Sequence, residues 1–513
     1  MTRTIAGAAA DLRTGRVSAS ELVDDAIAKA DASDATLGVF LHREAEDARQ
    51  AAAAADERFA RGCPVGPLDG IPLGIKDIFA CEGGPTTAQS LVLDRAWAQE
   101  TGDAPAVARL RAAGGIFLGK LTTMEFALGA PDPAKPFPLP RNAWNPDHYA
   151  GGSSSGCGSG VASGMVLGAL GSDTAGSIRM PAGFNGVTGL KPTFGRVPKA
   201  GMVPLSYTLD HVGPLARTAR DCALLLSVPA GHHPADPYAS ETTPGDYLGG
   251  LNGDLRGVRV GFDDLDRFAP RADPETAGLF AAMLAVQADA GAELVPVELP
   301  MYPELQAIDS LVMLAEGLSY HEGDLRARSA DYGQATRVLL TSARAITAAH
   351  YLQAMRVRRV AQAKMDALLD TVDLIATPMG HLGAPPMTEM SGLDPTSVMT
   401  ALHTAYWNPL GNPVLVVPMG LSAQRLPLAL SLAGRRWDEA LVLRAGDAVQ
   451  QRTTFHLDEP PVPGAVSLMP GADGSEEDAI AGISAALAAL GESMGEVAEA
   501  RYAEPSGGFG CGR

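Results

Sequence analysis

The order of apolar and polar positions along the chain predicts alternating strands and helices. Short apolar runs, typical of buried strands, occupy residues 71–75, 115–118, 258–262, 292–297, 372–377 and 413–417. Helical patterns lie at residues 45–61, 104–113 and 274–290, and most of residues 307–369 also has a helical pattern. This alternation is typical of an α/β domain, in which helices pack on a central sheet. The helices of 307–369 are expected to form a cover over that sheet.

Two further helices carry recognisable start signals. Ser18 and Glu21 have the spacing of a capping box, which predicts a helix from Ser18 through Ala30. Near the end of the chain, Ser475 and Asp478 offer an N-cap. Behind that cap, apolar residues recur every three or four positions at Ile480, Ile483, Leu487, Leu490, Met494 and Val497. The repeat is short for a coiled coil, so we expect this helix, about 476–502, to dock on its own chain rather than on a second copy.

Composition and charge exclude several classes of protein. The 513 residues are 46% hydrophobic, enough for a large core, and 40 Lys+Arg against 59 Asp+Glu give a net charge of −19. Such an acidic chain lacks the basic surface of nucleic-acid or anionic-membrane binders. The uncharged stretches 148–172 and 395–424 are too rich in Gly and Ser, or too broken by Pro, to span a bilayer. The five cysteines form no C-x-x-C pair, so neither a disulfide framework nor a thiolate zinc site is indicated. We expect a cytoplasmic protein.

Three short motifs point to chemistry that their context does not support. The P-loop pattern of residues 114–120 is followed by Leu121 where a Ser or Thr is needed, and the glycines at 156, 158 and 160 lack dinucleotide spacing. Residues 152–156 match the nucleophile elbow G-x-S-x-G around Ser154, which also needs a preceding strand and a later histidine. Residues 142–150 have a loop pattern, although His211, His381 or His403 are conceivable partners. The elbow, with an esterase activity, stays a minor alternative.

Glycine is concentrated in one segment that has a recognisable sequence. Glycine makes up 58 of 513 residues, about 11%, where about 7% is usual. The segment from Gly151-Gly-Ser-Ser-Ser-Gly156 through Leu170-Gly-Ser-Asp-Thr-Ala-Gly-Ser-Ile-Arg179 to Lys191-Pro192 resembles the amidase signature family. Further matches are Pro67-Leu-Asp-Gly-Ile-Pro-Leu-Gly-Ile-Lys-Asp77, Gly119–Ala127, Leu209–Pro214, Asp373–Pro378 and Gly411–Gly420. The resemblance covers about residues 5–457 in order.

The resemblance implies a catalytic Ser–Ser–Lys triad of Lys76, Ser153 and Ser177. Ser177 would be the nucleophile, and Ser153, which follows a cis peptide bond after Gly152, would relay its proton to Lys76. This assignment is chemically sensible because a serine hydroxyl needs a neighbouring base. A lysine amine becomes such a base when burial favours its uncharged form.

The resemblance also implies an oxyanion loop and residues that support it. Backbone N–H groups of Thr174, Ala175, Gly176 and Ser177 would converge on the substrate's carbonyl oxygen. Ser154 is expected to hydrogen-bond within the serine cluster. Arg179 is expected to order the loop through Asp173 or a carbonyl group, and a structural role for both is equally open.

The fold implied by the resemblance is one large α/β domain with a mixed, twisted sheet covered by helices on both faces. It would span residues 1–457, with the catalytic core at about 67–220 and the helical pocket cover at about 300–410. Residues 458–513 would form a C-terminal extension. Candidate pocket residues are Met124, Phe126, Met202, Tyr207 and Tyr406, although each alone also fits ordinary packing.

The substrate class follows from the resemblance only in outline. Family members hydrolyse primary amides, aryl amides, fatty amides, carbamates or urea derivatives, and no metal or organic cofactor is implied. Aromatic and Met side chains suit a small apolar or aryl amide, anilide or urethane, handled by a monomer or homodimer. One branch is the glutaminase subunit of a tRNA-dependent amidotransferase. This chain departs from that branch at Met180, where the subunit has Gln, and at residues 333–337, which lack its basic helix motif. We therefore favour a stand-alone amidase.

Overall fold

Eleven strands form one mixed sheet in the part of the chain described by the computed structural model, which is residues 3–390, 401–464, 466–467, 469 and 474–503. The strand order is β1-β3-β2-β4-β6-β5-β10-β11-β9-β7-β8. Parallel pairs flank β2 and β7, and the central pairs are antiparallel. The strands are β1 (Phe40–Arg43), β2 (Pro72–Lys76), β3 (Ile116–Leu121), β4 (Gly168–Asp173), β5 (Thr188–Lys191), β6 (His211–Ala216), β7 (Arg259–Phe262), β8 (Glu293–Pro296), β9 (Leu374–Pro378), β10 (Val414–Leu421) and β11 (Pro427–Gly434).

Helices cover both faces of this sheet, as expected. Val416 of β10 packs in one apolar cluster with Phe184 of α7 (Arg179–Phe184). Its neighbour Leu415 contacts Gly446 of α14 (Glu439–Gln450). Because successive residues of a strand point to opposite faces, α7 and α14 lie on opposite sides of the sheet. The predicted α/β class with a mixed sheet is confirmed.

The amino-terminal third supplies further helices around the first strands. They are α1 (Ile5–Thr14), α2 (Ala19–Leu37), α3 (Ala45–Ala60), α4 (Trp97–Thr101), α5 (Pro105–Ala112) and α6 (Ser155–Ala162). The capping box at the start of α2 is present, since the Glu21 N–H donates to Ser18 Oγ at 3.0 Å and the Ser18 N–H donates to Glu21 Oε2 at 2.8 Å. The helix continues past the predicted end at Ala30 and stops at Gly38, whose φ of 59° the helix cannot continue.

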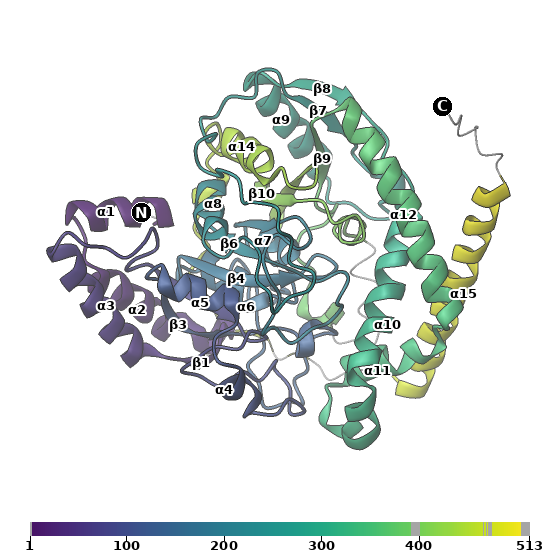
Figure 1. Ribbon diagram of the computed structural model, residues 1–513, viewed down its shortest axis with the longest axis horizontal. Coiled ribbons are helices and arrows are strands. Elements are labelled where there is room, and N and C mark those ends of the chain that lie inside the picture. Colours follow the sequence, from purple (N-terminus) through teal and green to yellow (C-terminus); the bar gives the residue numbers. More distant parts are fainter. Residues whose placement is uncertain (1–2, 391–400, 465, 468, 470–473, 504–513) are drawn as a thin grey trace.

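A layer of long helices flanks the sheet (Figure 1). It contains α10 (Tyr302–Arg328), α11 (Gln334–Ser342) and α12 (Ala348–Thr371), where the sequence predicts a helical cover. The part of that cover at 391–400 lies outside the described residues. Two other helices, α8 (Ala219–Ser227) and α9 (Thr276–Asp289), pack on the sheet itself.

The predicted carboxyl-terminal helix is α15 (Glu476–Ala503), and it packs on α11 and α12. Its buried side chains include Ile483, Leu487 and Met494, all members of the predicted apolar repeat. Of the helices in the described ranges, α15 alone is long and apolar enough, over Glu476–Ala498, to cross a membrane by length and composition. Its large apolar side chains are nevertheless turned onto the protein, so the helix docks on its own chain.

Candidate active site

The predicted lysine contacts two serine hydroxyls where two neighbouring parallel strands end, one predicted (Ser153) and one not (Ser172). Lys76 is the last residue of β2, and Ser172 lies near the end of β4, which pairs with β2. Lys76 Nζ lies 2.7 Å from Ser153 Oγ and 2.9 Å from Ser172 Oγ. Ser153 stands in the loop that leads into α6. The structure therefore builds a buried amine–hydroxyl cluster at the ends of β2 and β4.

Burial changes the protonation of this lysine. The Lys76 side chain is wholly buried, and this desolvation lowers the pKa of its amine from 10.5 to about 7, although Asp210 and Asp173 act in the opposite direction. Burial disfavours the charged form because a low-dielectric surrounding solvates an ammonium group poorly. Near neutral pH a large fraction of Lys76 is thus uncharged and able to accept a proton.

The loop that carries Ser153 has the unusual backbone that the resemblance implied. A cis peptide bond joins Gly152 to Ser153. A Cβ atom on Gly152 would lie 2.2 Å from Tyr149 Oη, so the position has room for glycine only. The Ser154 N–H donates to the Ser177 carbonyl at 3.1 Å, which ties this loop to the segment bearing the predicted nucleophile.

Ser177 lies between β4 and α7 and keeps 8% of its surface exposed. The carboxylate of Asp173 organises the backbone on either side of it. The N–H groups of Gly176 and Ile178 donate to this carboxylate at 2.9 and 3.1 Å. Ser177 is thereby fixed just before the start of α7, next to the loop of Ser153.

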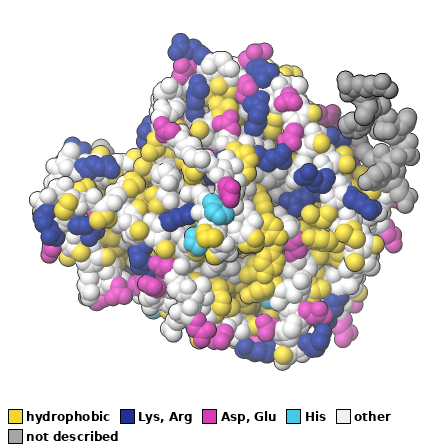
Figure 2. Space-filling view, in the orientation of Figure 1, with side chains coloured by type: hydrophobic (Ala, Val, Ile, Leu, Met, Phe, Trp, Pro, Cys, Tyr) yellow, Lys and Arg dark blue, Asp and Glu magenta, His cyan; other side chains and the backbone are white. Residues whose placement is uncertain are grey.

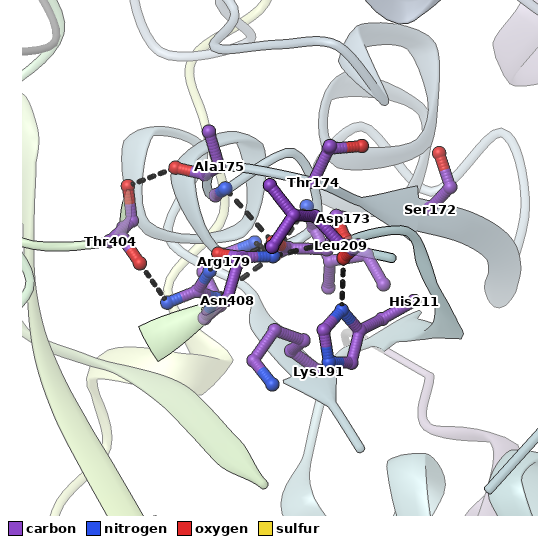
Figure 3. A network of polar contacts seen from close by, with 12 residues as sticks. Ser172, Asp173, Thr174, Ala175, Arg179, Lys191, Leu209, His211, Thr404 and Asn408 are labelled. Carbon is purple, nitrogen blue, oxygen red and sulfur yellow. Dashed lines mark hydrogen bonds and ion pairs between the residues drawn. The ribbon is translucent and has the colours of Figure 1, made fainter. Parts of the chain in front are cut away.

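Arg179 holds that carboxylate, and neither group is exposed (Figure 3). The guanidinium donates to Asp173 Oδ2 and Oδ1 at 2.9 and 2.8 Å, to the Thr404 carbonyl at 2.7 Å and to Asn408 Oδ1 at 2.6 Å. Burial alone would raise the pKa of Asp173, but the facing guanidinium outweighs it and holds this pKa well below its usual range. Both predicted partners of Arg179, Asp173 and a carbonyl group, are present.

One of the four predicted oxyanion donors is already engaged. The Gly176 N–H donates to Asp173 Oδ1 rather than into the site, which removes it from the expected set. The neighbouring residues are anchored by other groups: Thr174 Oγ1 donates to Asp210 Oδ1 at 2.6 Å, and Thr404 Oγ1 donates to the Ala175 carbonyl at 2.7 Å. Thr174, Ala175 and Ser177 remain as candidates.

The five predicted pocket residues have different surroundings: Phe126, Met202 and Tyr406 belong to the large apolar core, and Met124 belongs to a smaller apolar cluster. Met124 lies against Gly152, beside the serine loop, and Met202 bridges to Phe79 just beyond β2. Tyr207 is 47% exposed. Phe126 packs on the ring of His321 with 4.4 Å between centroids, and Tyr406 stacks on Tyr302 at 5.3 Å.

The structure does not build the serine–histidine pair that an elbow requires. Ser154 Oγ donates to the Ser172 carbonyl at 3.1 Å instead of to a histidine. The ring nitrogens of His381 and His403 lie 2.8 Å apart, and His211 Nδ1 lies 2.6 Å from the Leu209 carbonyl. Within the ranges the structure describes, no group of three or more His, Cys, Asp or Glu side chains is placed to hold a metal ion.

Comparisons with known proteins identify the family of the chain. The sequence profile of the Amidase family matches residues 21–443. The chain belongs to the amidase signature family. One subunit of the glutamyl-tRNA(Gln) amidotransferase of Chloroflexus aurantiacus is 36% identical over 481 residues, covering 89% of this chain and 98% of that protein.

Solved amidase structures have the same fold. A crystal structure of an amidase superposes with a TM-score of 0.77 at 30% identity, covering 88% of this chain and 100% of the other. The peptide amidase of Stenotrophomonas maltophilia superposes with a TM-score of 0.74 at 28% identity, covering 90% and 98%. This amidase is accordingly a family hydrolase that acts on amides, built on one large mixed α/β domain.

Sequence reasoning missed four polar residues of this candidate site. Ser172 contacts Lys76, and Asp210, Thr404 and Asn408 contact Thr174, Ala175 and Arg179. Ser172 and Asp210 lie inside the quoted family motifs, at Leu170–Arg179 and Leu209–Pro214, so their positions offered a signal. Thr404 and Asn408 lie more than 220 residues from Arg179, in a segment without a recognisable motif.

Proposed function

We propose that this amidase is a stand-alone hydrolase that cleaves the C–N bond of a small amide or carbamate through an acyl-enzyme on Ser177. The observation that carries the proposal is the buried Lys76 amine, within hydrogen-bond distance of Ser153 and with its pKa lowered to about 7. A neutral amine has one lone pair and two N–H bonds. It can therefore donate to Ser172 Oγ while accepting the proton of Ser153.

The proposed reaction begins with the neutral amine. Lys76 takes the Ser153 proton as Ser153 takes that of Ser177, and Ser177 Oγ bonds to the substrate's carbonyl carbon. The N–H groups of Thr174, Ala175 and Ser177 would stabilise the resulting oxyanion. The proton returns through Ser153 to the nitrogen, the C–N bond breaks, and ammonia or an amine leaves. Water then cleaves the ester on Ser177 by the same relay, which gives the acid and the free enzyme.

The substrate is proposed to be small and apolar or aryl: a primary amide, an anilide or a urethane. Met124 beside the serine loop and the exposed ring of Tyr207 support this preference. The same acyl-enzyme chemistry would also accept an aryl ester. The protein is proposed to work in the cytoplasm, as a monomer or homodimer, without cofactor or nucleic-acid partner.

A substrate panel with two variants tests the proposal. Wild-type protein is assayed on primary amides, anilides, urethanes and esters, beside Ser177→Ala and the control Ser163→Ala, whose hydroxyl bonds only to helix carbonyls. Ser177→Ala should lose turnover and keep its circular dichroism, and the control should keep both. A fluorophosphonate label mapped by peptide mass should lie on Ser177. Retained turnover in Ser177→Ala, or a label on Ser154, would overturn the assignment.

The named relatives favour one second candidate, a glutaminase subunit of a tRNA-dependent amidotransferase. Met180 and the residues of 333–337 speak against it. Arg337, the basic residue of that stretch, is bound to Glu476 of α15 and donates to the Tyr332 carbonyl at 3.1 Å. An isolated chain that turns over no panel amide but hydrolyses glutamine once a co-expressed partner co-purifies with it would establish this second candidate.

A further inference from the structure

A buried carboxylate connects the oxyanion loop to a surface turn. Asp210 lies directly before β6 and is 2% exposed. Its Oδ1 accepts the hydroxyl of Thr174 at 2.6 Å. Its Oδ2 accepts the N–H groups of Leu205 and Ser206, each at 3.0 Å. One side chain thus holds the first residue after β4 and the turn that precedes β6.

The bond to Thr174 bears directly on the oxyanion donors. Thr174 and Ala175 carry two of the three remaining candidate N–H groups, and their peptide planes must be held by neighbouring contacts. On the far side, Thr404 Oγ1 holds the Ala175 carbonyl, and Asp173 holds the Gly176 N–H. The hydrogen bond from Thr174 to Asp210 fixes the first residue of the same loop, directly after β4. Donors to a developing oxyanion work only when their direction is fixed before reaction.

A second carboxylate holds the same turn from the helical layer. Glu316 of α10 accepts the Ser206 hydroxyl at 2.5 Å, and both the N–H and the hydroxyl of Thr208, at 3.0 and 2.8 Å. The hydroxyl of Tyr351, on α12, donates to Glu316 at 2.7 Å. Glu316 therefore acts on the turn, whereas Asp210 acts on both the turn and Thr174.

Tyr207 stands between the residues that these carboxylates hold. Its carbonyl accepts from Lys199 Nζ at 2.6 Å, and its ring is largely exposed. Tyr320 of α10 also keeps 38% of its surface exposed. Figure 2 shows hydrophobic side chains gathered on the face that it draws, over the region where the long helices meet the sheet. A half-exposed tyrosine therefore lies on the turn that Asp210 links to the oxyanion loop.

We infer that Asp210 is a positioning residue that aims the Thr174 and Ala175 N–H groups at the oxyanion, while Glu316 holds Tyr207 where it meets the apolar part of the substrate. The inference rests on the proposed function. The two carboxylates share one turn but act on different steps: Asp210 on the chemical step and Glu316 on substrate binding. Loss of the first should change kcat, and loss of the second should change KM.

The test compares variants on the best chromogenic anilide of the panel. Thr174→Val keeps the shape of the side chain but removes its hydroxyl. It should lower kcat about 10- to 100-fold, since a small misplacement of catalytic groups lowers the rate by up to about 100-fold. KM should stay within about threefold of wild type. Thr174→Ser should restore kcat to within about threefold of wild type. The Thr174→Val/Asp210→Asn double variant should be no slower than the worse single variant, because both remove one hydrogen bond.

Glu316→Ala should raise KM about tenfold or more with kcat within about threefold. Glu322→Gln on the exposed face of α10, where Glu322 pairs only with Arg326 at 3.2 Å, is the matched control and should change neither. Thermal melts confirm folding of each variant. If Thr174→Val unfolds, the Thr174→Ser and Asp210→Asn variants test the positioning role instead. We expect Thr174→Ser to have a kcat near that of wild type and Asp210→Asn to have a lower kcat.

Fluorophosphonate labelling separates this inference from the proposed function. The rate constant for labelling Ser177 should fall with kcat in Thr174→Val, because the phosphoryl oxygen occupies the same N–H groups. No label on Ser177 of wild type would remove the proposed function itself. Two outcomes with a labelled, active wild type would overturn only the positioning role of Asp210. One is a Thr174→Val variant with unchanged kcat, and the other is an equal loss of kcat in Thr174→Val and Glu316→Ala.

Discussion

Replacing the buried lysine should make the protein more stable near neutral pH while it abolishes turnover. The pKa of Lys76 falls from 10.5 to about 7 on folding because the side chain is wholly buried. Between these two values the unfolded chain binds one more proton at this position than the folded chain. The folding stability that this group contributes therefore rises with pH across that window. Lys76→Met has nearly the same shape and no titrating group.

The size of the effect follows from that pKa difference at about 1.4 kcal/mol per unit. Holding Lys76 uncharged costs about 4 kcal/mol at pH 7.5 and about 1.5 kcal/mol at pH 9.5. Lys76→Met removes this cost but leaves Ser153 and Ser172 without the amine, a loss of about 1–2 kcal/mol. The variant should be about 2–3 kcal/mol more stable at pH 7.5 and about equal to wild type at pH 9.5.

Differential scanning calorimetry of both proteins at the two pH values measures this. A chain of 513 residues has an unfolding entropy of about 1 kcal/mol per degree. The variant should therefore melt about 2–3 °C higher at pH 7.5, and the gap should close by pH 9.5. Other titrating groups act alike in both proteins, so the change in the gap isolates Lys76. A variant that melts lower at pH 7.5, or a gap independent of pH, would refute a neutral, desolvated lysine.

Three further predictions concern the pH profile, the buried ion pair and the last helix. On the acid side, kcat/KM should fall tenfold per pH unit below a midpoint near 7, because the protonated form of the lysine cannot accept a proton; a flat profile between pH 5.5 and 7 would contradict this. Arg179→Met should lower the unfolding free energy by about 3–5 kcal/mol, read from urea midpoints, because Asp173 is left buried without its partner; a loss below about 1 kcal/mol would contradict a buried ion pair. Gly491→Ala should lower the melting temperature, since its Cβ would lie 2.3 Å from the His350 ring. Gly482→Ala, with open space around it, should raise the melting temperature slightly. Equal shifts of the two melting temperatures would show that α15 does not dock on α12.

Continuous apolar runs made part of the sheet predictable. All six predicted strands form, and four of them, β2, β3, β9 and β10, are buried along nearly their whole length, as expected of such runs. Strand β4, with the sequence Gly-Ala-Leu-Gly-Ser-Asp, escaped prediction because its side chains serve the site. A Cβ on Gly171 would lie 2.9 Å from Ser154 Oγ, and Ser172 faces Lys76. The small and polar residues that the site requires in β4 have a weaker preference for strand structure than the apolar residues of the other strands.

The motifs located the proposed triad residues but not the polar contacts around them. Lys76, Ser153 and Ser177 lie within recognisable local sequences, whereas Thr404 and Asn408 act only through the fold. Arg179 reaches both across more than 220 residues of chain. A single hydrogen bond between such distant residues leaves no spacing pattern in one sequence. Contacts of this kind become visible only with the folded structure.

The glycine-rich stretch that carries the resemblance was also the hardest to read as secondary structure. Residues 155–162 contain three glycines and have the composition of a loop, yet they form α6. Each glycine in a helix costs about 1 kcal/mol relative to alanine. The helix forms because its backbone packs directly on other backbone: a Cβ on Gly156 would lie 2.5 Å from the Val39 carbonyl, and one on Gly158 would lie 2.5 Å from that of Pro181. Close backbone approach thus outweighs helix propensity here, and the same glycines that obscure the helix in the sequence let α6 pack beside the loop in which Ser153 contacts Lys76.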